Sequence, residues 1–358
     1  MSAAGNIEWV AESPAGPLEI TINRAKPEKD PRAIAAAACA GSGGAVRGQG
    51  ASPASQADGG AAGETCPLCW KGADADGAHS GSSARAHLVA SGAPVTPVVL
   101  GGETWAWWFS PYGYFPEHLI AASPGHRPMA ITHGTVERLL DFADTYPRWF
   151  IGSNAELPLV GGSLLAHDHF QGGGHRFPLM KAPVERTFPL PGLPRVEAGI
   201  VRWPASVVRL RGADRASLYA GACRVMDAWR VFDDEACGIR SHTIAPGGAP
   251  VPHSTLNPIL WREGGDYVCD LVLRNNRTTP ERPWGLFHVP ERLFHIKKEN
   301  IGLIEVMGRA ILPGRLAAEW PGVRPACESA FYEILQAVGV FKQNEAGRAG
   351  WDRFIATL

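Results

Sequence analysis

The stretch that most constrains this chain is residues 161–175, with the sequence GGSLLAHDHFQGGGH. Its apolar start and the alternation that follows predict a short strand, on which every second side chain faces the same side. His167, His169 and Gln171 would then share one face. Glycines on both sides leave backbone N–H groups uncrowded, so that an anion can approach closely. Two imidazoles and an amide on one surface suit a phosphate, and the alternative is a pair of hydrogen-bonded histidines beneath a loop.

Length and composition indicate a globular protein. The 358 residues can form one large domain or two of ordinary size, with a substantial core. Apolar residues make up 45% of the chain, which argues against disorder. The formal net charge of −1 gives no overall field that would draw the protein to nucleic acid or a membrane, so anion binding must come from local placement.

The cysteines and the start of the chain bear on the compartment. Seven is an odd number of cysteines, and only Cys66 and Cys69 are closely spaced, so a secreted disulfide framework is not expected. The N-terminus shows no charged segment followed by an apolar run, and the chain has no apolar stretch long enough to span a bilayer. We therefore expect a cytoplasmic protein.

Hydrophobic periodicity predicts strands and helices on both sides of the central stretch. Predicted strands are 18–22, 105–109, 118–122, 206–210, 267–273 and 301–307. Apolar residues at helical spacing predict helices at 136–143 and 218–229, and a helical C-terminal region from 325 to 358.

Two stretches rich in Ala, Gly and Ser, residues 33–63 and 74–83, are predicted to be mobile loops. Between them, Cys66 and Cys69 have the two-residue spacing that can put both sulfurs on one metal, and redox or vestigial roles are the alternatives.

A basic cluster, Arg24, Lys26, Lys29 and Arg32, is interrupted by prolines and so cannot be a simple helix. It is either solvated surface or a source of phosphate contacts.

The residues before the central stretch carry a family resemblance. Residues 154–160, NAELPLV, run into Gly-Gly-Ser and HDHFQ, and together they resemble the signature of the type II hexose-1-phosphate uridylyltransferases. These are the bacterial galactose-1-phosphate uridylyltransferases, distant members of the histidine-triad superfamily. Further matching segments, in family order, are 18–23, 26–31, 110–112 with 115–118, 271–277 and 295–308. The resemblance covers nearly the whole chain and is weakest between about residues 35 and 93.

The resemblance implies an α+β fold of two histidine-triad-like halves, each a mainly antiparallel sheet packed with helices. We place these halves at residues 1–200 and 201–358. It also implies a homodimer, with no nucleic-acid or membrane partner. The family normally has a further segment, predicted to be helical, before the point where this chain begins, so we expect a truncated or compact variant.

The activity that the resemblance implies is transfer of UMP between UDP-glucose and galactose 1-phosphate, in galactose metabolism. A neutral imidazole is a good nucleophile toward phosphorus, and its phosphoramidate is labile. By resemblance, His169 attacks the α-phosphorus of UDP-glucose, and a hexose 1-phosphate then collects UMP from uridylyl-His169. Asp168 is given no catalytic role.

The resemblance also assigns binding residues. Ser163 and Gln171 are expected to donate to the α-phosphate, and Asn154 to help fix the nucleotide. Lys298 stands four residues before Gly302, a spacing similar to that of a phosphate-contacting lysine in type I relatives, and surface charge is its alternative role.

The ligand set that the resemblance implies for a structural zinc ion is Cys66, Cys69, His118 and His167. Four nitrogen and sulfur ligands are the number that a closed tetrahedral zinc site needs. Type II members vary in metal content, so a chain without zinc is the alternative. No organic cofactor is expected.

Other functions remain open at this level. UMP transfer from UTP to a hexose 1-phosphate, or phosphorolysis of another nucleotide sugar, would keep the chemistry and change the partner. A catalytically degenerate UDP-sugar-binding protein and a zinc-stabilised scaffold are the non-enzymatic alternatives.

Overall fold

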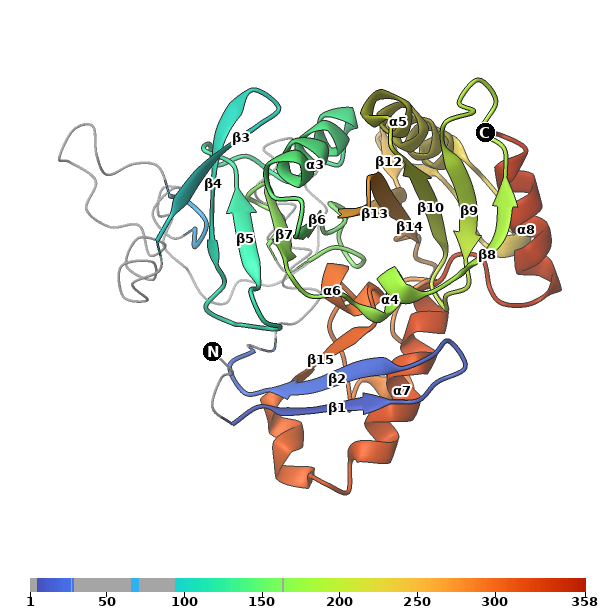
Figure 1. Cartoon of the computed structure of the whole chain (residues 1–358). Coiled ribbons are helices and arrows are strands. Elements are labelled where there is room, and N and C mark those ends of the chain that lie inside the picture. Colours follow the sequence, from blue (N-terminus) through green and yellow to red (C-terminus); the bar gives the residue numbers. More distant parts are fainter. Residues whose placement is uncertain (1–4, 27, 29–65, 71–93, 163) are drawn as a thin grey trace.

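The computed structural model describes residues 5–26, 28, 66–70, 94–162 and 164–358. Both predicted mobile loops, residues 33–63 and 74–83, lie outside the described residues. The described residues form three sheets, of which the largest is a ten-stranded antiparallel sheet (Figure 1).

The large sheet has the strand order β3-β4-β5-β7-β6-β13-β14-β10-β9-β8. Its strands are β3 (Thr96–Leu100), β4 (Glu103–Phe109), β5 (Leu119–Ala122), β6 (Phe150–Gly152), β7 (His169–Gly173), β8 (Val184–Phe188), β9 (Glu197–Val201), β10 (Val207–Gly212), β13 (Ser254–Glu263) and β14 (Asp266–Asn275).

This sheet contains the same arrangement twice. In the first repeat, β3, β4 and β5 pair in order, helix α3 (His133–Thr145) follows, and β7 returns beside β5 with β6 next to it. In the second, β8, β9 and β10 pair in order, helix α5 (Arg215–Val231) follows, and β14 returns beside β10 with β13 next to it. The repeats meet where β6 pairs with β13. Residue 200 lies in β9, a strand of the second repeat, and the division of the chain at residue 200 remains a prediction.

The two faces of the sheet are covered differently. Helices α3 and α5 pack on one face, and α8 (Glu345–Ile355) joins the same core. The other face carries α4 (Pro178–Lys181), α6 (Leu303–Val306) and α7 (Arg324–Val338). Figure 1 shows α3 and α5 above the strands of the large sheet, and α4, α6 and α7 below them.

A small sheet pairs two N-terminal strands with one strand from the second half of the chain. The strands β1 (Ile7–Ala11) and β2 (Leu18–Asn23) are antiparallel, and β15 (Arg309–Pro313) pairs with β2 in parallel. The third sheet is the hairpin β11 (His242–Ile244) and β12 (Pro250–Pro252). Short 3-10 helices are η1 (Glu235–Cys237), η2 (Glu291–Leu293) and η3 (Gly314–Glu319). None of the helices in the described part of the chain is long and apolar enough to cross a membrane.

Most predicted elements are confirmed. Strands β2, β4, β5, β10 and β14 and helices α3, α5, α7 and α8 lie where periodicity placed them, and the α+β class is correct. The strand predicted at 301–307 is wrong, because helix α6 begins there. The Asn154 side-chain oxygen accepts from the Leu303 N–H at 2.8 Å, and the Glu305 carboxylate accepts from the Gly302 N–H at 2.8 Å. These two acceptors satisfy amides that begin a helical turn.

The central stretch is a strand only from His169 onward. His167 therefore precedes β7 and does not share a strand face with His169 and Gln171. On β7, Phe170 belongs to the core beneath α3 and α5, and its ring stacks on Trp105 with centroids 4.8 Å apart. Because side chains alternate along a strand, His169 and Gln171 face the opposite side, toward α6.

Candidate active site and metal centre

The side chain of His169 is held in one tautomer. It stands at the start of β7, opposite Ala122 of β5, and its Nδ1 lies 2.7 Å from the His167 carbonyl oxygen. A carbonyl can only accept, so Nδ1 carries the proton and Nε2 keeps its lone pair. Burial lowers the pKa of His169 to about 4, so the ring is neutral near pH 7. This is the form of imidazole that can act as a nucleophile.

His169 lines a cavity of about 430 Å³ between the large sheet, α6 and the segment after β2. One part of the lining is apolar and comes from Leu68, Trp108, Ile120 and Leu164, which pack with the Cys66–Cys69 segment. A cavity that combines an apolar lining with a few polar groups is typical of a small-molecule site.

The charged part of the cavity lining is a buried quartet of Lys26, Lys297, Glu299 and Glu305. Lys26 is paired with Glu299, and the Lys297 ammonium lies 2.9 Å from Glu299 and 2.5 Å from Glu305. Although burial opposes ionisation of Glu299, the two lysines lower its pKa to about 2. The quartet therefore presents charged donors and acceptors side by side, with little net charge.

Two further cavity residues are tied to neighbouring elements. The Gln171 side-chain oxygen accepts from His118 Nε2 at 2.9 Å. The Asn154 side-chain oxygen accepts a hydrogen bond from the first amide of α6, and the Asn154 amide nitrogen lies next to Gly162. A Cβ atom at Gly162 would lie 2.6 Å from this nitrogen, so the close approach requires glycine.

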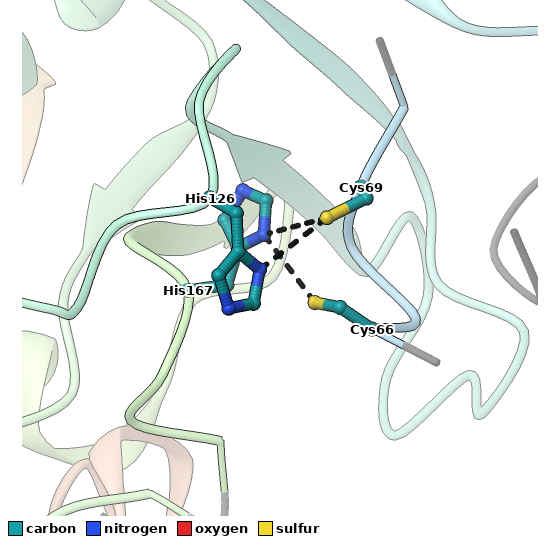
Figure 2. A group of neighbouring side chains, drawn as sticks. All are labelled: Cys66, Cys69, His126 and His167. Carbon is teal, nitrogen blue, oxygen red and sulfur yellow. Dashed lines mark hydrogen bonds between the residues drawn. The ribbon is translucent and has the colours of Figure 1, made fainter. Parts of the chain in front are cut away.

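Four nitrogen and sulfur ligands gather beside this cavity. Cys66, Cys69, His126 and His167 each offer one atom, and these atoms all lie within 4.8 Å of one another (Figure 2). The Cys66 sulfur is 3.4 Å from His167 Nδ1, and the Cys69 sulfur is 3.4 Å from His126 Nδ1 and 3.6 Å from His167 Nδ1. Tetrahedral zinc with ordinary Zn–S and Zn–N bonds would separate a sulfur and a nitrogen by about 3.6 Å.

The tautomer of His167 also suits a metal ligand. Its Nε2 lies 3.1 Å from the Ser123 carbonyl oxygen and therefore carries the proton, which leaves Nδ1 free to bind. The residues present thus fit a Cys₂His₂ zinc ion.

The comparisons with known proteins are consistent along the whole chain. Residues 142–326 match the model of the galactose-1-phosphate uridyl transferase C-terminal domain. The galactose-1-phosphate uridylyltransferase of Halalkalibacterium halodurans is 42% identical, over 99% of this chain and 73% of the relative. The protein of the same name from Lactiplantibacillus plantarum is 40% identical, over 99% and 74%, and that from Bacillus subtilis is 39% identical, over 99% and 72%. The chain belongs to the galactose-1-phosphate uridylyltransferase family.

Three of the binding and catalytic residues inferred from the uridylyltransferase motif lie together. Asn154, His169 and Gln171 all line the cavity, whereas Ser163 lies outside the described residues. Lys298 is not among the lining residues, and its Nζ lies 5.7 Å from the centroid of the Trp284 ring. The neighbouring Lys297 lines the cavity instead.

The metal-ligand set inferred for a uridylyltransferase needs one correction. Cys66, Cys69 and His167 come together as expected, but the fourth residue beside them is His126 and not His118. His118 precedes β5 and is bonded to Gln171, which keeps its ring on the cavity side. Sequence reasoning missed His126 because it stands in a loop after β5, and no regular spacing links it to the cysteines.

The charged quartet was also missed as a unit. Lys26 belonged to the predicted basic cluster, but its carboxylate partners follow it by more than 270 residues in the sequence. The only available signal was the density of charged residues in the family segment 295–308.

Proposed function

We propose that this chain is a nucleotidyltransferase that moves UMP between UDP-glucose and galactose 1-phosphate through a uridylyl-His169 intermediate. The observation that carries the proposal is the fixed tautomer of His169, whose Nδ1 is bonded to the His167 carbonyl at 2.7 Å in the lining of the cavity. The names of the relatives support the choice of substrates.

The first step forms one bond and breaks one. His169 Nε2 attacks the α-phosphorus of UDP-glucose, the bond from that phosphorus to the bridging oxygen breaks, and the oxygen leaves on glucose 1-phosphate. The imidazole of the adduct keeps its Nδ1 proton and gains positive charge, which the His167 carbonyl oxygen is placed to stabilise. An oxygen of galactose 1-phosphate then attacks the same phosphorus, and Nε2 leaves with its electron pair.

The two parts of the cavity lining support an orientation for the substrate. Uracil suits the apolar part around Leu68 and Trp108, because a planar base gains from contact with apolar and aromatic groups. The hexose suits the charged quartet. Its ammonium groups can donate hydrogen bonds to sugar hydroxyl oxygens, and its carboxylates can accept hydrogen bonds from sugar hydroxyl groups. Gln171 and Asn154 lie in the lining to position the phosphates.

A structural zinc ion is part of the proposal. Cys66, Cys69, His126 and His167 would hold it, and the ion would fix the Cys66–Cys69 segment against the start of β7. We expect about one zinc ion per chain, and we expect a chelator to lower the melting temperature of the protein. Metal analysis of the purified protein and of Cys66→Ser checks this, and an equal zinc content in both would contradict it.

Incubation with UDP-glucose labelled in the uracil ring tests the chemistry. The wild type should retain label after quenching and denaturation, His169→Asn should not, and galactose 1-phosphate should discharge the label as UDP-galactose. UDP-glucose binding without a covalent adduct would overturn the enzymatic proposal in favour of a binding protein. A homodimer, implied by the resemblance, is proposed with it and is checked by light scattering.

A further inference from the structure

His118 is a buried polar residue that is neither the proposed nucleophile nor one of the candidate metal ligands. It immediately precedes β5, lines the cavity, and has only 3% of its surface exposed. Its ring stacks on Tyr114, with centroids 5.4 Å apart and planes 21° apart, and Phe115 packs against it at 4.5 Å. These contacts fix the plane of the imidazole.

The bond from His118 to Gln171 has a direction. The Gln171 side-chain oxygen can only accept, so His118 Nε2 holds the proton and donates over 2.9 Å. His118 Nδ1 then keeps a lone pair, and this atom is buried without a hydrogen-bond partner among the described residues. Burial lowers the pKa of His118 to about 4, so the ring is neutral near pH 7.

An unpaired buried nitrogen is costly, at about 1–3 kcal/mol, so a histidine is a poor choice if it only fills space here. A phenylalanine would make the same ring contacts without this cost. What histidine adds is one donor aimed at the Gln171 oxygen.

That donor determines which end of the Gln171 amide is available to a ligand. With its oxygen bound to His118, the amide turns its NH₂ group away from His118, and Gln171 lines the cavity. A free amide could rotate by half a turn and present its oxygen to the phosphate, which would replace a hydrogen bond by repulsion.

We propose that His118 is a positioning residue for uridylyl transfer: it holds the Gln171 amide so that the NH₂ group faces the α-phosphate. The inference rests on the proposed function and assigns to His118 a role distinct from metal binding. It acts through Gln171, so its effect should vanish when Gln171 is absent.

Four proteins make the test: the wild type, His118→Phe, Gln171→Ala and the double variant. The readout is the single-turnover rate of label transfer from UDP-glucose to His169. We expect His118→Phe to slow this rate by about 10- to 100-fold, in keeping with the loss of one aligned donor. In the Gln171→Ala background, the same change should alter the rate by less than about 2-fold, because the coupled pair is already broken.

His118→Gln is the rescue variant. Its amide nitrogen can donate from near the position of His118 Nε2, so it should recover most of the rate that His118→Phe loses. The zinc content of both variants should equal that of the wild type, because His118 does not belong to the group of Cys66, Cys69, His126 and His167.

The outcomes separate this inference from the function on which it rests. Equal slowing by His118→Phe with and without Gln171 would overturn it and show a merely structural role. Loss of zinc in His118→Phe would overturn it in favour of metal binding. If the wild type forms no adduct, the proposed function fails by itself. The same four proteins then decide through their UDP-glucose affinities measured by calorimetry, where additive losses would overturn the inference.

Discussion

At the scale of single residues, His118 should make the protein sensitive to acid. Burial lowers its folded-state pKa to about 4, whereas an unfolded histidine titrates near 6.5. Between these values the unfolded chain binds the proton and the folded chain does not. The free energy of unfolding therefore decreases as the pH falls from about 6.5 toward 4, by up to about 1.4 kcal/mol per pH unit.

Comparison of the wild type with His118→Gln isolates this effect. The variant lacks the titrating ring, so the difference in unfolding free energy should move in its favour by about 1–2 kcal/mol between pH 7 and pH 5. Urea unfolding at the two pH values measures it. A difference that stays constant would show that folding does not lower the pKa of His118.

Lys297 should matter more than its neighbour Lys298. Its side chain is only 3% exposed and its ammonium pairs with both Glu299 and Glu305, so Lys297→Met removes one cation from two buried carboxylates. Loss of one partner from a buried ion pair typically costs about 3–5 kcal/mol. We expect Lys297→Met to destabilise the fold and to weaken galactose 1-phosphate binding at least about 10-fold.

Lys298→Met is the matched control for this prediction. Lys298 is adjacent in sequence but is not among the residues that line the cavity. The affinity of the Lys298→Met protein for galactose 1-phosphate should therefore stay within about 2-fold of the wild type. Calorimetric titration of both variants decides. A larger loss in Lys298→Met than in Lys297→Met would restore Lys298 as the phosphate contact.

At the scale of elements, an ion-pair network lies between the candidate metal ligands and the strand that carries His169. Asp168 lies between His167 and His169, and its carboxylate is 3.4 Å from the Arg127 guanidinium. The Asp168 N–H also donates to the Arg127 carbonyl at 2.7 Å, and the guanidinium makes two bonds, of 3.0 and 2.7 Å, to Glu103 at the start of β4. Three separate segments are therefore held together next to the candidate metal ligands His126 and His167.

Arg127→Met should loosen this junction. Burial raises the pKa of Asp168 and Arg127 opposes that effect, so the variant leaves a poorly solvated carboxylate without its cation. We expect a loss of about 1–3 kcal/mol in urea unfolding at pH 7. Arg127→Lys, which keeps the charge but not the two-pronged contact to Glu103, should lie between. Equal stability of all three proteins would contradict this account.

These elements also show what the sequence could reveal. Strands such as β2 and helices such as α3 were predictable because their apolar periodicity is local. Helix α6 was not, because it has four residues and its first amides are satisfied partly by Asn154, which is 149 residues away. His169 was recognisable from a family motif, whereas His126 and the partners of Lys26 depend on contacts between distant segments.

At the scale of the whole molecule, the duplicated topology places the site near the junction of the repeats. Strands β6 and β13 join them through two residue pairs, Gly152 with Ile259 and Ile151 with Leu260. Gly152 also pairs with Gln171 on β7 and lies against Leu303 of α6. The junction thus supports both the strand that carries His169 and the helix that closes the cavity.

Gly152→Ala should disturb stability and activity together. A Cβ atom there would lie 2.9 Å from the Pro258 carbonyl oxygen and 3.1 Å from a Leu303 methyl group, so β13 or α6 must shift. Overpacking of this kind costs about 1–3 kcal/mol, and a shift of α6 would also move the amide bonded to Asn154. We expect a lower unfolding midpoint in urea and a slower uridylyl transfer.

Gly247→Ala is the control, because a Cβ atom at Gly247 meets nothing within 4 Å. This variant should change neither the unfolding midpoint nor the transfer rate. If Gly152→Ala lowered the midpoint but left the transfer rate unchanged, the junction of the repeats would be mechanically separate from the site.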